Sequence, residues 1–285
     1  MLKTAVLFVL ALLAFAGNSV INRLALLQQS IDAGSFVAIR IISGAAAMFL
    51  IWWLVQRWQQ PRITASLRRG SWWGASMLLL YAVAFSLAYR ELETGFGALI
   101  LFASVQMSML LVSCYKGAKL SAKEWLGSAI ALLGLSYLVW PTLTVPSSLL
   151  ACLMMILAGS AWGLYSLHGR ASTAPLTDTT FNFIRAVPLA LVIWLLFLPS
   201  LMFTEAGIWL AILSGVVTSG VGYAIWYLVL PRVKVTSAAI GQLSVPLLAA
   251  LGGVLFAGEL LTSQVLVAAL LILGGMALVS FKTKK

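Results

Sequence analysis

Charged residues are scarce in this chain, and their scarcity sets its class. Only 9% of the 285 residues are charged, against about a quarter in soluble globular domains. The hydrophobic share is 62%, and the mean hydropathy is +1.05. So little charge cannot cover a water-facing surface, so the composition excludes a soluble globular domain and predicts a protein embedded in a membrane.

Metal-binding and catalytic side chains are equally few. His168 is the single histidine, and the two cysteines, Cys114 and Cys152, have no CxxC spacing. The chain has no G-x-S-x-G or H-E-x-x-H motif, and no pair of carboxylates within an apolar run. We therefore expect no metal, no cofactor and no enzymatic activity, with both cysteines packed as small hydrophobic side chains.

What the sequence does have is a series of long apolar runs. A membrane crossing by an α-helix takes about 20 apolar residues. We read ten such runs, at residues 4–27, 34–56, 71–90, 94–115, 122–141, 147–168, 179–199, 206–230, 235–257 and 262–281. They leave no length for a soluble domain, so the helices themselves must carry the function.

The formal net charge of +11 is distributed by loop. Basic residues gather in alternate connections and at the chain ends: Lys3, Arg57, Arg62, Arg68, Arg69, Lys116, Lys119, Lys123, Arg170, Arg232, Lys234, Lys282, Lys284 and Lys285. The other connections carry Asp32, Glu91, Glu93, Glu205 and Glu259, with Arg90 as their one basic residue. Short basic loops stay in the cytoplasm, so this alternation predicts cytoplasmic termini and does not indicate a nucleic-acid partner.

The two halves of the chain resemble each other weakly. Phe36-Val-Ala-Ile-Arg40 recurs as Phe181-Asn-Phe-Ile-Arg185, and Lys116-Gly-Ala-Lys-Leu-Ser121 is echoed by Ala257-Gly-Glu-Leu-Leu-Thr262, at offsets of about 145 and about 141 residues. Such a repeat of membrane segments is typical of secondary transporters. With an odd number of helices in each half, the halves must enter the bilayer in opposite senses. The expected fold is therefore all-α, with ten transmembrane helices in two inverted five-helix repeats, 1–141 and 142–285.

Polar and aromatic side chains within the apolar runs are the candidate substrate contacts, because buried polar groups in lipid are costly and usually face a cavity or another helix. The candidate cavity residues are Asn18, Asn22, Arg23, Tyr81, Phe85, Phe102, Gln106, Trp162, Tyr165, Tyr223, Trp226, Gln242 and Pro246. For the amides the alternative is hydrogen bonding between helices, and for the aromatics it is packing or an interfacial belt. Pro246 is expected to kink the ninth helix near its middle and free a carbonyl near Gln242.

Two arginines hold matching places in the repeats. Arg40 and Arg185 each lie one to two turns inside a helix, one toward each side of the membrane. They either snorkel to the interface or act as gates that bind acidic groups in alternation. Arg23, deeper in the first helix, is the stronger candidate for substrate contact.

These features resemble the EamA family of the drug/metabolite transporter superfamily. The resemblance rests on the two five-helix repeats, Trp162-Gly163, Pro246 followed by Ala257-Gly-Glu259-Leu-Leu-Thr262, and the closing Gly274-Gly275. It implies a central cavity and movement of small metabolites. The family pattern would also place a proline near Val105-Gln106 and a glutamate at Ala118, and the chain departs from it at both positions.

The sequence therefore predicts a multi-pass transporter of the bacterial cytoplasmic membrane. It is expected to export a small polar or amphipathic, amino-acid-like metabolite by alternating access. The alternatives are a carrier of nucleotide sugars or lipid-linked sugars, or a membrane receptor or assembly factor that transports nothing. All seven carboxylates map to loops or helix ends, which predicts facilitated diffusion or exchange rather than proton coupling. The sequence sets no oligomeric state and is compatible with a monomer.

Overall fold

The computed structural model describes residues 2–28, 30–59, 69–117, 121–140, 146–170, 172–198, 201–229, 232 and 241–280. Within these residues the protein is helical, apart from turns and one isolated bridge between Ile31 and Phe203. The helices are α1 (Leu2–Leu27), α2 (Ala33–Gln59), α3 (Trp72–Ala88), α4 (Thr94–Tyr115), α5 (Ala122–Val139), α6 (Pro146–Arg170), α7 (Pro175–Leu195), α8 (Glu205–Leu213), the π-helix η3 (Ser214–Val221), α9 (Gly222–Val229), α11 (Val245–Ala257) and α12 (Ser263–Ser280). The elements α8, η3 and α9 follow one another without a break.

Six helical stretches of the described chain are long and apolar enough to cross a membrane: Leu2–Leu27, Ala33–Trp58, Thr94–Tyr115, Ser148–Gly169, Pro175–Leu195 and Glu205–Val229. Shorter apolar helices cover Trp72–Ala88, Val245–Ala257 and Ser263–Leu278. Large apolar side chains such as Leu111, Leu196 and Leu270 stay exposed on the outer surface of the bundle. The expected helical membrane protein is confirmed at this level.

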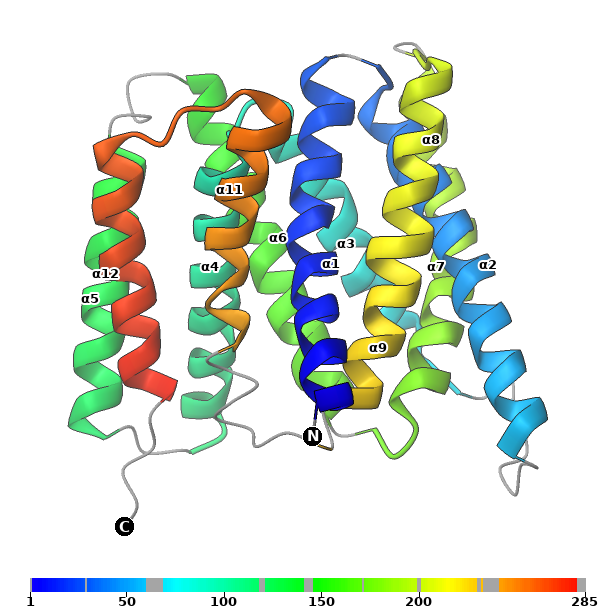
Figure 1. Cartoon of the computed structure of the whole chain (residues 1–285), viewed down its shortest axis with the longest axis horizontal. Coiled ribbons are helices and arrows are strands. Elements are labelled where there is room, and N and C mark those ends of the chain that lie inside the picture. Colours follow the sequence, from blue (N-terminus) through cyan, green and yellow to red (C-terminus); the bar gives the residue numbers. More distant parts are fainter. Residues whose placement is uncertain are drawn as a thin grey trace.

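The helices stand side by side in one bundle (Figure 1). At one edge α5 packs along α12, and at the other α2 packs along α7 and η3. Between these edges α6 packs against α3 and α4, while α1 packs against α11, η3 and α9. The first residues of α1 and the last of α12 lie at the same end of the bundle (Figure 1).

Glycines let the backbones approach where helices cross. A Cβ at Gly163 would lie 2.1 Å from Ser108 Oγ and 3.0 Å from the Val105 carbonyl oxygen, so α6 touches α4 directly. A Cβ at Gly275 would lie 2.4 Å from the Gly127 carbonyl oxygen of α5. Small residues at helix crossings are the usual packing device in membranes, and they hold the walls of the bundle close together here.

The helical path is interrupted near the place where Pro246 was expected to kink the ninth helix, since helical residues 241–242 are separated from α11 by a turn. Pro246 lies in the first turn of α11, directly after a turn at residues 243–244. Proline is well tolerated there because the amide hydrogens of a first helical turn have no partner within the helix. Of the expected span 235–257, residues 235–240 lie outside the described part of the chain.

Candidate functional site

A buried polar network surrounds Asn18, whose side chain is 5% exposed, near the middle of the bundle. Its Oδ1 accepts hydrogen bonds from Ser214 Oγ at 2.9 Å and Thr218 Oγ1 at 3.1 Å. Its Nδ2 donates to the Tyr81 hydroxyl at 3.0 Å. Asn18 thus joins α1 to α3 and to the π-helix η3.

Asn22 extends this network by one helical turn. Its Nδ2 donates to the Asn18 carbonyl oxygen at 2.9 Å, and its Oδ1 accepts from Ser86 Oγ at 2.8 Å. The amide of Asn22 is therefore fully engaged between α1 and α3. Interhelical hydrogen bonding, one of the two alternatives for these amides, accounts for its contacts in this conformation.

The π-helix η3 supplies side chains that the sequence analysis missed. Ser214, Thr218 and Ser219 are all buried, and each bonds a residue of α1 or α2. π-Helical turns are rare and often occur at functional sites. The signal in the sequence was a group of small hydroxyl residues set among glycines within an apolar span, S-G-V-V-T-S-G.

Aromatic rings form a continuous wall beside the network. The Tyr81 and Trp162 ring centroids are 5.1 Å apart, and those of Trp162 and Tyr223 are 5.2 Å apart. Phe85 packs on Tyr81 at 5.1 Å, and Tyr165 stacks on Trp162 at 5.6 Å. The structure therefore brings together predicted cavity residues from α3, α6 and α9.

Trp226 joins this wall through a further aromatic ring, that of Phe15 in α1. Phe15 lies 5.5 Å from Trp226 and 5.9 Å from Tyr223, measured between ring centroids. The wall therefore extends along α9 toward the end of the bundle where α1 begins.

Arg40 lies in this central region as well, and its side chain is 2% exposed. Its Nε donates to Ser219 Oγ at 3.3 Å, and its Nη2 donates to the Tyr81 hydroxyl at 3.5 Å. An arginine that snorkels would extend toward the end of the bundle instead. The snorkelling alternative is therefore wrong for Arg40, because its guanidinium is directed at the polar network.

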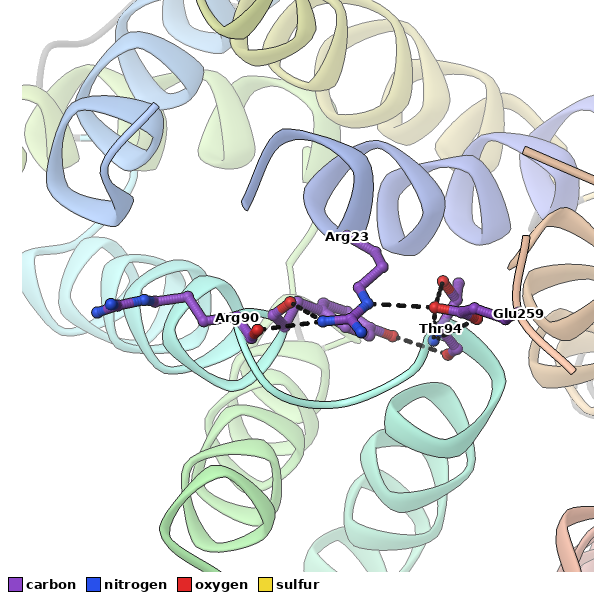
Figure 2. Close-up of polar contacts among 5 residues, drawn as sticks. Arg23, Arg90, Thr94 and Glu259 are labelled. Atoms are coloured by element: carbon purple, nitrogen blue, oxygen red, sulfur yellow. Dashed lines mark hydrogen bonds and ion pairs between the residues drawn. The ribbon is translucent and has the colours of Figure 1, made fainter. Parts of the chain in front are cut away.

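Arg23 and Glu259 form an ion pair at one end of the bundle, where each side chain is 9% exposed (Figure 2). Arg23 Nε donates to Glu259 Oε1 at 3.2 Å. The Arg23 Nη1 donates to the carbonyl oxygens of Tyr89 and Arg90, at 3.1 Å each. Arg23, predicted to contact substrate, thus caps the carbonyl end of α3 in this conformation.

The Glu259 carboxylate caps the amide end of the next helix. It accepts from the Thr94 backbone amide at 2.8 and 2.9 Å and from Thr94 Oγ1 at 3.0 Å. Thr94 is the first residue of α4, where the helix dipole favours an anion. We call the side chains of Arg23, Thr94 and Glu259, with the carbonyls of Tyr89 and Arg90 just after α3, the latch. It ties α1, α3, α4 and the α11–α12 connection together.

Hydrogen bonds between side chains and backbone groups fasten the opposite end, which we call the Asn182 end. Asn182 Oδ1 accepts from the Ser71 amide at 2.7 Å, and Arg185 Nη1 donates to the Arg69 carbonyl oxygen at 2.6 Å. Asp178 Oδ1 accepts from the Gly70 amide at 3.0 Å. These contacts hold the connection before α3 against α7, close to the exposed His168.

The remaining candidates stay apart from the central network. Gln106 and Gln242 are half-buried, and their side chains make no hydrogen bond within the described part of the chain. Phe102 and Pro246 are buried. No group of three metal-binding side chains occurs among the described residues.

Comparison with known proteins finds a family model and several similar proteins. Residues 149–281 match the model of the EamA-like transporter family. "Uncharacterized protein PA1977" of Pseudomonas aeruginosa is 44% identical over 277 residues, which cover 97% of this chain and 94% of that protein. "Uncharacterized transporter YwfM" of Bacillus subtilis is 25% identical over 274 residues, covering 92% and 88% of the two chains.

A solved structure described as "Crystal structure of protein" shares the fold, with a TM-score of 0.65 at 18% identity over 97% of this chain and 96% of that one. "Uncharacterized transporter YoaV" of Bacillus subtilis is 21% identical, with 86% of each chain covered. Family, relatives and apolar helices agree on a multi-pass membrane transporter that is not an enzyme. The chain belongs to the EamA-like transporter family, within the drug/metabolite transporter superfamily.

Proposed function

We propose that this transporter exports a small polar or amphipathic, amino-acid-like metabolite across the bacterial cytoplasmic membrane by alternating access. The observation that carries the proposal is the central site. Polar groups of α1, α2, α3 and η3 meet the aromatic wall of α3, α6 and α9 within one bundle. Few polar groups set in an apolar and aromatic lining are typical of sites for small molecules.

Helix packing supports two inverted repeats, 1–141 and 142–285. Under such a repeat, α1 to α5 correspond to α6, α7, the continuous α8–η3–α9, α11 and α12. The packing of α6 on α3 and α4 then corresponds to that of α1 on η3, α9 and α11. The pairs α2–α7 and α5–α12 each correspond to themselves. These pairings are those expected of ten helices related by a two-fold axis in the membrane plane.

The charge pattern supports a cytoplasmic location for the Asn182 end. Arg57, Arg69 and Lys116 belong to this end, and the termini of the first and last helices lie there too (Figure 1). The latch then lies on the outer side. Because the latch is closed, the conformation is closed on the outer side, and the contacts at the Asn182 end would have to open for an exporter to accept a substrate from the cytoplasm.

The lack of a central carboxylate supports exchange or facilitated diffusion. All seven carboxylates belong to the described chain, at helix ends or connections, whereas Arg40 is charged at the centre. A nucleotide-sugar carrier would need several cations to hold its phosphates. A single central arginine favours a smaller substrate.

The test is transport by the purified protein in proteoliposomes loaded with single unlabelled metabolites. Exchange against the same radiolabelled compound identifies substrates from a panel of amino acids, small acids and nucleotide sugars. Saturable exchange of an amino-acid-like compound supports the proposal, and exchange of nucleotide sugars alone contradicts it. Concentrative uptake driven by an imposed pH gradient and abolished by a protonophore would contradict the exchange mechanism.

A further inference from the structure

Arg40 carries a buried positive charge that no acidic side chain balances. Within the described chain, which includes all seven carboxylates, no acidic side chain forms an ion pair with Arg40. Arg40 Nη1 is buried and has no hydrogen-bond partner. Its neighbours on the other nitrogens, Ser219 and Tyr81, are neutral.

Tyr81 offers a second unused donor at the same place. Its hydroxyl oxygen accepts from Asn18 Nδ2 and from Arg40 Nη2, so both of its lone pairs are engaged. Within the described part of the chain, the hydroxyl hydrogen has no acceptor. Two donors, one of them cationic, therefore meet at a buried point without an acceptor.

Such an arrangement is costly unless an anion completes it. A guanidinium does not lose its proton in a protein, so Arg40 remains charged. Its contacts over the rings of Tyr81, at 5.4 Å, and Phe85, at 5.7 Å, hold the guanidinium in place but do not neutralise it. Leaving a hydrogen-bonding group unsatisfied in a membrane interior is strongly unfavourable.

The chemistry of the missing acceptor follows from charge and shape. One arginine balances one negative charge, and its planar fork matches a carboxylate. The rings of Tyr81, Trp162 and Tyr223 stand beside it and offer an apolar surface to the rest of the molecule. Trp162 is only half-buried, so the wall is not closed at that point.

We propose that Arg40 Nη1 and the Tyr81 hydroxyl bind the carboxylate of a small, monoanionic or zwitterionic substrate with an apolar body. This assignment rests on the proposed transport function and names the chemical class of its substrate. In the present conformation Arg40 is enclosed, so the carboxylate reaches it when the helices separate at one end.

Minimal probes test the site without knowledge of the full substrate. The melting temperature of the purified protein is measured against increasing acetate or formate, with acetamide and formamide as neutral controls of matched shape. A ligand that binds only the folded state raises the melting temperature with its concentration. We expect stabilisation by the two carboxylates beyond that by the amides.

Three variants locate the effect. Arg40→Gln is expected to weaken the carboxylate response about 10- to 100-fold, as expected for loss of a charged hydrogen bond. Arg40→Lys keeps the charge and should retain part of the response. Arg57→Gln, on the same helix but exposed, should behave as the wild type. If Arg40→Gln does not fold, Tyr81→Phe tests the same site, because it keeps the ring and removes the hydroxyl donor.

If carboxylates and amides stabilise the wild-type protein equally, the assignment is wrong. It is also wrong if the stabilisation by carboxylates is unchanged in Arg40→Gln or, where that variant does not fold, in Tyr81→Phe. A second arm compares leucine, 4-methylpentanoate and leucinamide as ligands, which separates zwitterionic from simple acids. Exchange of a substrate that survives in Arg40→Gln would contradict the site but not transport. Carboxylate binding without exchange of any panel compound would contradict the proposed function but not the site.

Discussion

The two ends of the bundle are fastened by different chemistry. At the latch end, a buried ion pair joins Arg23 to Glu259, and each partner also caps a helix terminus. At the Asn182 end, side chains of α7 hold the connection before α3 through its backbone groups, as in the bond from the Ser71 amide to Asn182.

The proposed sequence repeat offers a reason for this difference. Arg23 corresponds to Arg170 in the second half, whereas Glu259 corresponds to Ala118 in the first. Ala118 lies outside the described residues. Under the proposed repeat, the acid of the latch has no counterpart in the first half, so the two ends are expected to close with different strength. Such an asymmetry biases a carrier toward one of its two closed states.

The strongest test removes the acid of the latch. Glu259→Ala leaves Arg23 buried without its counter-ion and removes the cap from α4, so we expect a loss of about 3–5 kcal/mol of unfolding free energy. The measurement is unfolding by SDS titration in mixed micelles. Glu91→Ala, an exposed carboxylate near the same end, is the control and should change little. Equal effects of the two substitutions would remove the distinction between latch and surface charge.

Reversing the pair tests the role of the helix termini. Arg23→Glu combined with Glu259→Arg keeps an ion pair but places a cation at the amide end of α4 and an anion at the carbonyl end of α3. We expect it to remain about 2–3 kcal/mol less stable than the wild type, from lost hydrogen bonds and unfavourable dipoles. If the double variant is as stable as the wild type in the same titration, the ion pair alone, and not the helix termini, accounts for the stability of the latch.

The Asn182 end should be more tolerant. Asn182→Ala removes the acceptor of the partly buried Ser71 amide and a donor to the buried Tyr165 hydroxyl. The expected loss is about 1–3 kcal/mol, smaller than that at Glu259 because no charge is left unpaired. Thr173→Ala, which removes only an exposed contact with Arg69, is its control. A loss larger than that of Glu259→Ala would reverse the comparison.

The smallest effect concerns Glu93, next to the latch. Burial raises the pKa of the Glu93 carboxyl above its usual 4.5, and the Glu259 carboxylate raises it further, while Arg23 lowers it. The folded protein then holds this proton more tightly than the unfolded chain, so stability falls as the pH rises from 4.5 through the raised folded pKa.

Glu93→Gln should remove that decline. At neutral pH we expect a gain below about 0.5 kcal/mol, or roughly 1–2 °C in melting temperature, because Glu93 is exposed and its charge is screened. Melting curves measure the effect at pH values from about 4, where an ordinary carboxyl begins to lose its proton, to about 8. If the melting temperature of the wild type rises with pH across this range more steeply than that of Glu93→Gln, the pKa of Glu93 is not raised in the folded protein.

Composition and hydrophobic patterning were enough to predict the helical membrane class, since backbone groups in lipid must be satisfied within each segment. Residue type also identified most of the central site, because Asn18 and Tyr81 are costly at that depth unless they meet partners. Matching motifs drew attention to Arg40 and Arg185 as a pair. Pro246 marked a distortion, but the sequence did not show its form: the proline lies in the first turn of α11, after a turn at residues 243–244.

Only the tertiary structure decided which side chains meet. The sequence by itself determined that the chain is a bundle of apolar helices with sparse polar groups, because burial in lipid constrains composition. Which way Arg40 points depends on Ser219 and Tyr81, and the role of Glu259 depends on the start of α4. These partners are far apart in the chain, and their contacts depend on the packing of several helices at once.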